Sequence, residues 1–344
     1  MLATTLAACG DEQDESSRPD LGGNVVVILT DDQTLASLEV MPRTRALIAD
    51  EGTEFRTAIV TMPLCCPSRA SFLTGQLAHN HGVLDNVGAN GGISAFDAEQ
   101  SLAVWLQDAG YTTSFLGKYL NGYGELTPAT VPPGWDRWFG LVDPTTYSYE
   151  GFTAFDGDQA QSFGPGEHQT QVLADHAVAE IDALAPEDAP FFLHVTPLAP
   201  HHADPREAGL GVTDVADLGE AIDAILPTAP GYEEAVASLT APAGPAQDEA
   251  DLSDKPPYVQ AEASVVRAAF AGVPGATPVQ LRDRYYRAYA SQLLALDEMV
   301  DQIVTALDES GELDETLIVF QSDNGLMLGE HGLFFRKIVP YDPS

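Results

Sequence analysis

Lysine is scarce in this sequence, with only Lys118, Lys255 and Lys337 among its 344 residues. Lysine and arginine together number 15 against 52 aspartate and glutamate residues, so the formal net charge is −37. Such an acidic chain disfavours nucleic acid as a partner. It also repels other polyanions at long range, until screening ends the repulsion within about 8 Å at physiological ionic strength. A site for an anion must therefore supply its own positive field at contact distance.

Long apolar runs and internal repeats are also missing. Without about 20 consecutive apolar residues, no segment qualifies as a transmembrane helix. The length is sufficient to bury a substantial core in one large domain, although the count alone permits two.

Short apolar segments alternate with amphipathic ones. They predict strands near residues 24–30, 111–116, 190–195 and 316–321, and helices near 42–50, 67–75, 99–109, 169–184 and 279–308. This order predicts an α/β fold with a largely parallel sheet covered by helices. The longest helix carries an apolar stripe at steps of three or four residues, formed by Tyr285, Tyr289, Leu293, Leu296, Val300, Ile303 and Leu307.

The stretch from about 204 to 277 is rich in Pro, Ala and Asp and lacks sustained periodicity. We interpret it as an insertion of long loops around a functional site. Together with the loops near 80–95 and 121–170, it is expected to select the substrate.

Two predicted strands end in oxygen-bearing side chains. Asp31 and Asp32 follow the first apolar run, and Asp323 and Asn324 follow the last. Ligands of open α/β sheets bind at the carboxyl ends of strands. Three carboxylates and one amide oxygen suit a hard cation such as Ca²⁺ or Mg²⁺. Either pair alone could instead serve as a turn or a helix cap.

A cysteine motif, Cys65-x-Pro-Ser-Arg, stands before a predicted helix. Pro67 suits the first position of a helix, which places Cys65 and Cys66 at its amino end and Arg69 on its first turn. Exposed N–H groups and the helix dipole favour an anion there. The alternative is a buried or disulfide-bonded cysteine pair at an ordinary junction.

The combined motifs resemble those of the formylglycine-dependent sulfatases, in the N-acetylglucosamine-6-sulfatase-like branch of the alkaline phosphatase superfamily. The resemblance extends from about Asn24 to Tyr341 and includes the segments 79–83, 131–136 and 249–256. It implies an alkaline phosphatase-like three-layer sandwich, with a catalytic domain over 24–344. No catalytic role is assigned to the segment 249–256, which could contact substrate or anchor a loop.

The resemblance also implies a nucleophile. In that family a formylglycine-generating enzyme oxidises the first cysteine of the motif, which makes Cys65 the precursor of formylglycine (3-oxoalanine). The aldehyde hydrates to a gem-diol, one hydroxyl takes the sulfuryl group, and collapse of the other expels sulfate. The implied cofactor is Ca²⁺, with Mg²⁺ as the alternative, bound by Asp31, Asp32, Cys65, Asp323 and Asn324.

Further residues match the family's sulfate-binding groups. Lys118 lies in Gly-Lys-Tyr-Leu-Asn, Lys337 follows Phe-Phe-Arg, and His201 lies in Ala-Pro-His. The resemblance implies that the lysines and His201 hold sulfate, that one lysine helps to protonate the leaving alcohol, and that Arg69 steadies the formylglycine and the metal ligands. His202 is the rival to His201, and surface lysines or a plain loop histidine are the alternatives.

The sequence departs from the family in two places. Many sulfatases have a histidine two residues after the first lysine, where this chain has Leu120, so the group that deprotonates the gem-diol is left open. Relatives also continue beyond the region of Tyr341, whereas this sequence stops at Ser344. We therefore expect a truncated chain that lacks the C-terminal subdomain.

The first 23 residues contain features that suggest where the protein is located in the cell. Leu6-Ala7-Ala8-Cys9 resembles a bacterial lipobox after a shortened signal, and residues 10–20 form an acidic tether. Lipid on Cys9 would attach the protein to a membrane, which predicts an extracytoplasmic location, either lipid-anchored at the surface or secreted. A chance Ala-Ala-Cys in a disordered leader is the alternative. With Cys9 lipidated and Cys65 oxidised, no disulfide framework is expected.

The predicted function is hydrolysis of sulfate esters on sulfated saccharides. A phosphodiester or phosphonate monoester hydrolase of the same superfamily is one alternative, because some of those enzymes use formylglycine at a similar site. A non-catalytic, glycan-binding surface lipoprotein is the other, and Leu120 and the early end of the chain motivate it.

Overall fold

The computed structural model describes residues 22–203, 225–242, 246–247, 249, 251–271, 273, 275–334 and 336–337. The predicted lipobox around Cys9 and the segment around Tyr341 lie outside these residues. Among the described helices, none is both long and apolar enough to cross a membrane.

A seven-stranded sheet in the order β5-β4-β3-β2-β6-β1-β7 forms the centre of the fold. Its strands are β1 (Asn24–Thr30), β2 (Thr112–Gly117), β3 (Arg137–Leu141), β4 (Thr153–Asp156), β5 (Gln159–Ser162), β6 (Phe191–Thr196) and β7 (Thr316–Ser322). The five strands from β3 to β7 in that order are parallel, and β4 and β5 add an antiparallel edge. The largely parallel sheet is confirmed.

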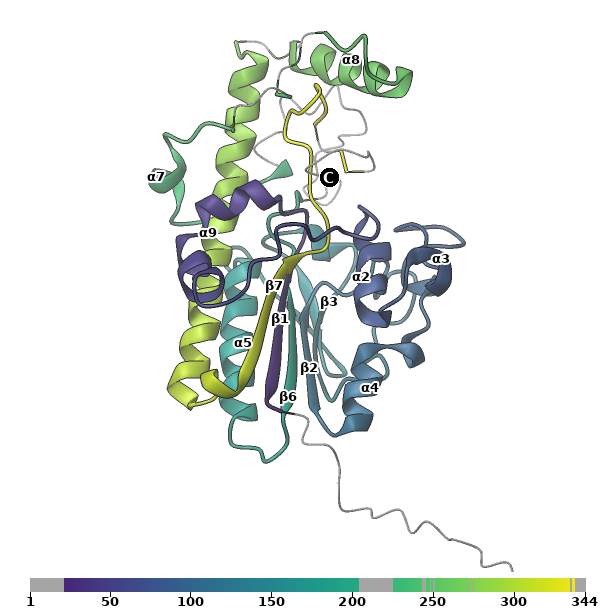
Figure 1. Ribbon diagram of the computed structural model, residues 1–344, viewed down its shortest axis with the longest axis vertical. Coiled ribbons are helices and arrows are strands. Elements are labelled where there is room, and N and C mark those ends of the chain that lie inside the picture. The colour runs from purple at the N-terminus through teal and green to yellow at the C-terminus, as the bar shows by residue number, and fades with distance from the viewer. Residues whose placement is uncertain are drawn as a thin grey trace, which may run out of the picture.

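Helices cover both faces of this sheet (Figure 1). The helices α5 (Gln169–Leu184) and α9 (Pro278–Ser310) lie on one side, and α2 (Cys65–Thr74) and α4 (Leu102–Ala109) lie on the other. The other helices among the described residues are α1 (Pro42–Thr44), which continues as a π-helical turn over Arg45–Ala49, α3 (Ala78–His81), α7 (Glu233–Val236) and the 15-residue α8 (Pro257–Ala271). The result is the predicted three-layer α/β architecture.

Strand periodicity divides the core that packs on the sheet into two clusters, one on each face. Val26 and Ile28 of β1 pack toward α5 and α9, whereas Val27 packs toward α2 and α4. Successive side chains of a strand point to opposite faces, so each strand of the parallel centre contributes to both clusters. This accounts for the unbroken apolar runs that predicted buried strands.

The longest helix begins and ends at recognisable signals. Thr277 and Gln280 form a reciprocal capping box, Pro278 occupies the first turn, and Gly311 ends the helix with φ of 80°. The predicted apolar stripe is buried along α9, which spans 33 residues. This helix therefore forms a fixed support beneath the carboxyl ends of β1 and β7.

Three features differ from the sequence-based expectation. Helix α2 begins at Cys65, so Pro67 is its third residue and not its first. The strands β3, β4 and β5 were not predicted, because they are short and β5 is exposed along its whole length. The region expected to form only long loops contains the 15-residue helix α8.

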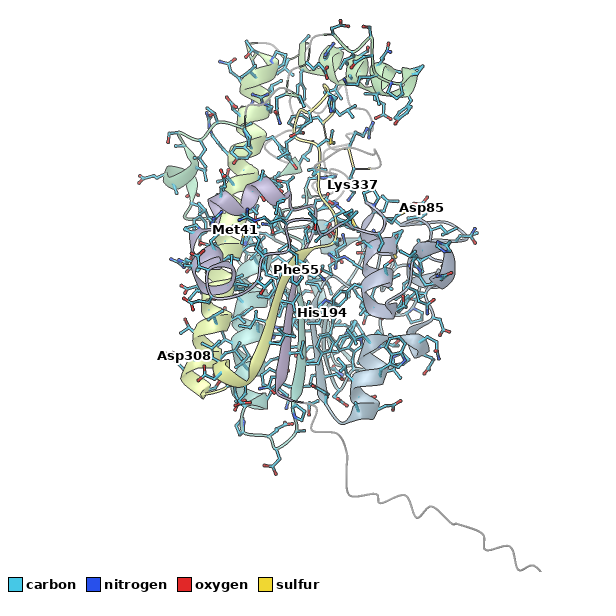
Figure 2. All side chains as sticks on the ribbon, in the orientation of Figure 1. Met41, Phe55, Asp85, His194, Asp308 and Lys337 are labelled. Atoms are coloured by element: carbon cyan, nitrogen blue, oxygen red, sulfur yellow. The ribbon has the colours of Figure 1, made fainter. Side chains whose placement is uncertain are left out.

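His194 is a buried imidazole in the cluster between the sheet and α2 (Figure 2). It is 2 % exposed, and its ring lies 5.0 Å from that of Phe72 and 5.6 Å from that of Phe115. Neither ring nitrogen has a hydrogen-bond partner among the described residues. Burial, together with the nearby charge of Arg69, lowers the pKa of His194 to about 3.

We predict that His194→Leu stabilises the protein, and most strongly in acid. In the unfolded chain His194 binds a proton below about pH 6.5, whereas in the folded protein it stays neutral down to about pH 3. The free energy of unfolding therefore decreases as the pH falls through this window. One pKa unit corresponds to about 1.4 kcal/mol, so His194 should lower the free energy of unfolding by about 2 kcal/mol between pH 8 and pH 5. This part of the decrease should be absent in His194→Leu. Urea unfolding at both pH values measures this, with His79→Leu at an exposed position as the control. An unchanged pH difference in His194→Leu would refute the prediction.

Candidate active site

The carboxyl ends of β1 and β7 bring two pairs of polar residues together. The two strands pair in parallel, with Thr30 opposite Ser322. Asp31 and Asp32 therefore emerge beside Asp323 and Asn324, and all four are at most 1 % exposed. The backbone N–H of Asp32 donates to Asp323 Oδ1 at 3.3 Å, which ties the two strand ends to each other.

Adjacent residues of a strand point to opposite faces, so a backbone turn is needed for both aspartates to face one site. Asp32 makes this turn in the left-handed region, with φ of 61°. Tyr289 of α9 holds the turn: its hydroxyl donates to the carbonyl of Asp32 at 3.0 Å and accepts from the N–H of Thr34 at 3.0 Å. The sequence placed Tyr289 in the core stripe but did not reveal this contact.

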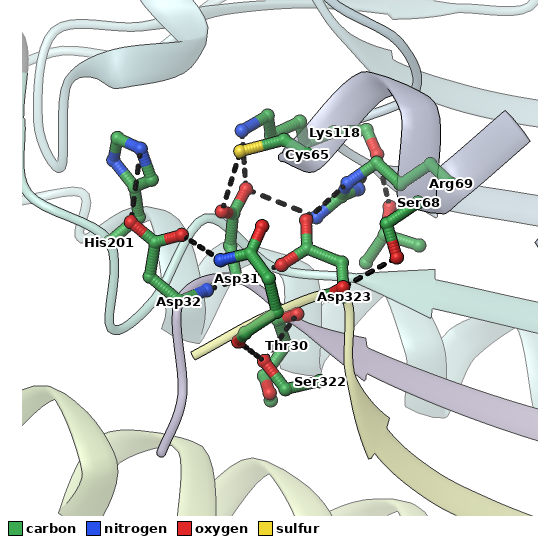
Figure 3. Close-up of polar contacts among 12 residues, drawn as sticks. Thr30, Asp31, Asp32, Cys65, Ser68, Arg69, Lys118, His201, Ser322 and Asp323 are labelled. Atoms are coloured by element: carbon green, nitrogen blue, oxygen red, sulfur yellow. Dashed lines mark hydrogen bonds and ion pairs between the residues drawn. The ribbon is translucent and has the colours of Figure 1, made fainter. Parts of the chain in front are cut away.

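Helix α2 contributes Cys65 and, one turn later, Arg69 (Figure 3). The Cys65 thiol donates to Asp31 Oδ1 at 3.3 Å. Arg69 is 2 % exposed and joins three elements: Nε donates to Asp323 Oδ2 at 2.9 Å, one terminal nitrogen to Asp31 Oδ2 at 3.1 Å, and the other to the carbonyl of Lys118 at 2.5 Å. The guanidinium thus locks α2 onto the strand ends.

Lys118 follows β2 and enters the site from the neighbouring strand. The close approach of Gly117 to β6 places it there, since a Cβ at Gly117 would lie 2.2 Å from the carbonyl oxygen of Thr196. The ammonium of Lys118 donates to Asp31 Oδ2 and lies 4.8 Å above the ring of Tyr147. The site therefore holds this lysine by charge on one side and by an aromatic face on the other.

Lys337 and His201 approach from the opposite side. Lys337 Nζ donates to Asp32 Oδ1 at 2.6 Å and lies 3.1 Å from Cys65 Sγ. His201 Nε2 lies 3.4 Å from Asp32 Oδ2, and its Nδ1 lies 2.6 Å from the carbonyl oxygen of His202. His202 does not take this position, because its ring stacks on that of His201 at 4.3 Å.

The structure thus brings every sequence-predicted site residue into one cluster: Asp31, Asp32, Cys65, Arg69, Lys118, His201, Asp323, Asn324 and Lys337. Leu120 is not part of it. That side chain is 2 % exposed and packs in the apolar cluster beside α2. The remaining residues that position the cluster, Tyr289, Tyr147 and Thr34, were not singled out from the sequence as site residues.

The buried carboxylates of the site lie in direct contact with positively charged side chains, which shift their pKa values. Burial alone favours the neutral acids, but Lys118 and the surrounding cations hold the pKa of Asp31 well below its usual range. Lys337 and His201 likewise lower the pKa of Asp32 against its burial. Burial and the neighbouring Asp31 charge raise the pKa of Asp323. A dication would relieve this remaining repulsion.

The Cys65 side chain is poorly suited to attack as a thiol. Burial, together with the charge of Asp31, raises its pKa to about 12, so it is protonated at neutral pH. The thiolate is the nucleophilic form of cysteine. Nucleophilic attack from position 65 therefore requires a functional group other than this protonated thiol.

The donor set fits a divalent cation. Asp32 Oδ2 and Asn324 Oδ1 are buried oxygens with no hydrogen-bond partner among the described residues. Donor atoms of Asp31, Asp32, Cys65 and His201 all lie within 4.8 Å of one another. This group differs from the sequence-predicted ligand set in including His201, whereas both oxygens of Asp323 already accept hydrogen bonds from Arg69 and the Asp32 N–H.

Comparison with known proteins places these residues in context. A family model described as Sulfatase matches residues 23–342. The chain is 32 % identical over 330 residues to an arylsulfatase of Volvox carteri, and 31 % identical over 348 residues to an extracellular sulfatase SULF-1 homolog of Drosophila melanogaster. It is 30 % identical over 333 residues to the N-acetylglucosamine-6-sulfatase of Homo sapiens. These matches cover 93 %, 96 % and 93 % of the chain but 49 %, 27 % and 54 % of the relatives, so the chain spans about half of their length or less.

Solved structures share the fold. A protein in complex with its substrate D-glucosamine-2-N,6-O-disulfate superposes with a TM-score of 0.62 at 24 % identity, covering 92 % of this chain and 68 % of that one. A phosphonate monoester hydrolase from Silicibacter pomeroyi superposes with a TM-score of 0.63 at 22 % identity, covering 93 % and 66 %. At these identities the similarity concerns the fold alone.

We predict that Tyr289→Phe weakens divalent-cation binding about tenfold, because losing a contact that orients a ligand typically costs that much or more. The variant leaves the carbonyl of Asp32 and the N–H of Thr34 without their partner and frees a strained turn. Calorimetric titration with Ca²⁺ measures the change. Tyr286→Phe removes a hydroxyl from the same helix that makes no hydrogen bond to the turn among the described residues, so this variant should bind Ca²⁺ like the wild type. Equal affinities for both variants would contradict the positioning role.

Proposed function

The chain belongs to the sulfatase family, and from that premise we propose that it hydrolyses sulfate esters of saccharides through a formylglycine made from Cys65. The observation that carries the proposal is the network of three cations and three buried carboxylates in which Cys65 contacts Asp31 and Lys337 directly. The named relatives that act on sulfated sugars support the substrate class.

Formylglycine at position 65, once hydrated, supplies the hydroxyl that attacks sulfur. Position 65 lies at the first residue of α2, where N–H groups of the first turn and the helix dipole favour an anion. Lys337 contacts the sulfur at this position and Lys118 contacts Asp31 beside it, so the two lysines provide a positive field at contact distance in an otherwise strongly acidic chain. We propose that these two lysines and His201 hold the sulfate oxygens.

Proton transfer can be assigned to residues around position 65. Because Asp31 Oδ1 accepts from the Cys65 side chain at 3.3 Å, we propose it as the acceptor for the attacking hydroxyl's proton, the role left open by Leu120. Lys337 Nζ lies 3.1 Å from Cys65 Sγ, and we propose that this lysine donates a proton to the leaving alcohol. Arg69 binds Asp31 and Asp323 and keeps both oriented.

We propose Ca²⁺ as the bound cation, with Mg²⁺ as the alternative, because the mature site offers oxygen ligands. When bound, the dication would neutralise the carboxylates and would polarise a sulfate oxygen. Asp31, Asp32, Asp323, Asn324 and position 65 would hold it, and His201 lies close enough to Asp32 to take part.

The remaining assignments concern maturation and location. A formylglycine-generating enzyme would convert Cys65 during maturation. The extracellular sulfatase homolog of Drosophila supports an extracytoplasmic location. Lipid on Cys9, outside the described residues, would anchor the protein at the surface.

Substrate preference tests the proposal against a phosphodiester or phosphonate monoester hydrolase. We expect a higher kcat/KM for an aryl sulfate than for a matched aryl phosphodiester, and sulfate release from at least one member of a panel of defined sulfated saccharides. Cys65→Ala should abolish both, whereas Cys66→Ala should retain most of the activity. A higher kcat/KM for the diester would overturn the sulfatase assignment. Saccharide binding with no sulfate release by the fully oxidised protein would favour a binding lipoprotein instead.

The role of the cation is tested by removing one of the carboxylates. Asp323→Ala should lower Ca²⁺ affinity at least about tenfold and reduce turnover with it, since Asp323 contacts both Arg69 and the Asp32 turn. Asp314→Ala, at an exposed position before β7, is the matched control. Turnover that survives exhaustive chelation would exclude a functional cation.

A further inference from the structure

We propose that the protein has a second, earlier metal-binding state: while Cys65 is still a thiol, Cys65 Sγ, His201 Nε2, Asp31 Oδ1 and Asp32 Oδ2 form a tetrahedral site for zinc. This site belongs to the unoxidised chain and does not depend on sulfatase activity. It uses a sulfur and a nitrogen donor that a calcium site made of oxygens would not need.

The separations between donor atoms carry the proposal. Zinc binds sulfur at about 2.3 Å and nitrogen or oxygen at about 2.0–2.2 Å, so the edges of its tetrahedron measure about 3.3–3.6 Å. Cys65 Sγ lies 3.3 Å from Asp31 Oδ1, and His201 Nε2 lies 3.4 Å from Asp32 Oδ2. All four donor groups lie within 4.8 Å of one another, so closing the widest edge takes about 1.3 Å of side-chain movement.

Outer contacts orient the ligands for a metal. The Nδ1 atom of His201 lies 2.6 Å from the carbonyl oxygen of His202, so it carries the proton, and the lone pair of Nε2 faces Asp32. A metal-binding histidine usually makes such a contact with its second nitrogen.

The two carboxylates are arranged in the same way. Lys118 and Arg69 occupy Asp31 Oδ2, which leaves Oδ1 toward the sulfur. Lys337 occupies Asp32 Oδ1, and Asp32 Oδ2 has no hydrogen-bond partner among the described residues. Each aspartate thus keeps one oxygen available while a lysine holds the other.

Oxidation of Cys65 would change the metal preference of the site from zinc to calcium. Thiolate and imidazole select zinc over calcium, whereas hydrated formylglycine replaces the sulfur with oxygen and favours a hard cation. Binding of Zn²⁺ forms a Zn–S bond and releases the thiol proton to solvent, with no change in oxidation state. Lys337, 3.1 Å from the sulfur, is placed to stabilise the thiolate charge. The bound zinc would coordinate the sulfur of Cys65 and would be present only in protein in which Cys65 is not yet oxidised.

Cobalt(II) is the probe for this site, because a tetrahedral thiolate complex gives strong visible bands and a sulfur-to-cobalt charge-transfer band. The protein is the 344-residue chain with Cys9→Ser, made without formylglycine-generating enzyme, so that Cys65 and Cys66 are its only thiols. We expect both sets of bands at one equivalent of cobalt and their loss on addition of one equivalent of zinc. Calcium in excess should not displace the cobalt.

Two variants and the mature protein decide the outcome. Cys65→Ser should lose the charge-transfer band and bind zinc at least about tenfold more weakly. The neighbouring Cys66→Ser should keep both. The oxidised protein, which carries formylglycine at position 65, serves as a second sulfur-free comparison if Cys65→Ser fails to fold. Weak bands without charge transfer in the thiol protein, or a charge-transfer band that persists in Cys65→Ser or in the oxidised protein, would overturn the proposal without affecting the test of sulfate turnover.

Discussion

The balance between three buried carboxylates and the cations that face them is the constraint on which the rest of this structure depends. Asp31, Asp32 and Asp323 lie at strand ends where water does not reach them. Isolated buried charges are costly, and such carboxylates persist only when they are paired or bound to a metal. Arg69 provides the central pairing, because it bonds two of the three carboxylates and the backbone at Lys118. Helix α2, and with it Cys65, is positioned by that same guanidinium.

This balance also explains how an extremely acidic protein could hold an anionic ester. The whole chain carries a formal charge of −37, yet two of its three lysines donate to the carboxylates around Cys65. Their ammonium groups act at contact distance, where the screened field of the surface has little influence. The third lysine, Lys255, pairs with Glu249, which in turn contacts His331. The segment 249–256 therefore anchors the loop that leads to Lys337.

Much of this arrangement could be predicted from the sequence. Parallel strands end at one edge of a sheet, so apolar runs followed by Asp31-Asp32 and Asp323-Asn324 predicted a shared site. Other features have no such signal. The apolar stripe placed Tyr289 in the core but could not show that its hydroxyl holds a left-handed turn. Helix α8 was missed because its alanine-rich sequence lies among prolines, although alanine is the strongest helix former. The contact of His201 with Asp32 depends on a loop geometry that spacing does not reveal.

The central claim is that Cys65 is the precursor of the nucleophile, and mass spectrometry of catalytically active protein tests it most directly. The tryptic peptide that covers residues 57–69 contains both Cys65 and Cys66. We expect one cysteine to have exchanged its sulfur for an aldehyde oxygen at position 65, with Cys66 still open to alkylation. Active protein in which Cys65 is an unmodified thiol would contradict the account.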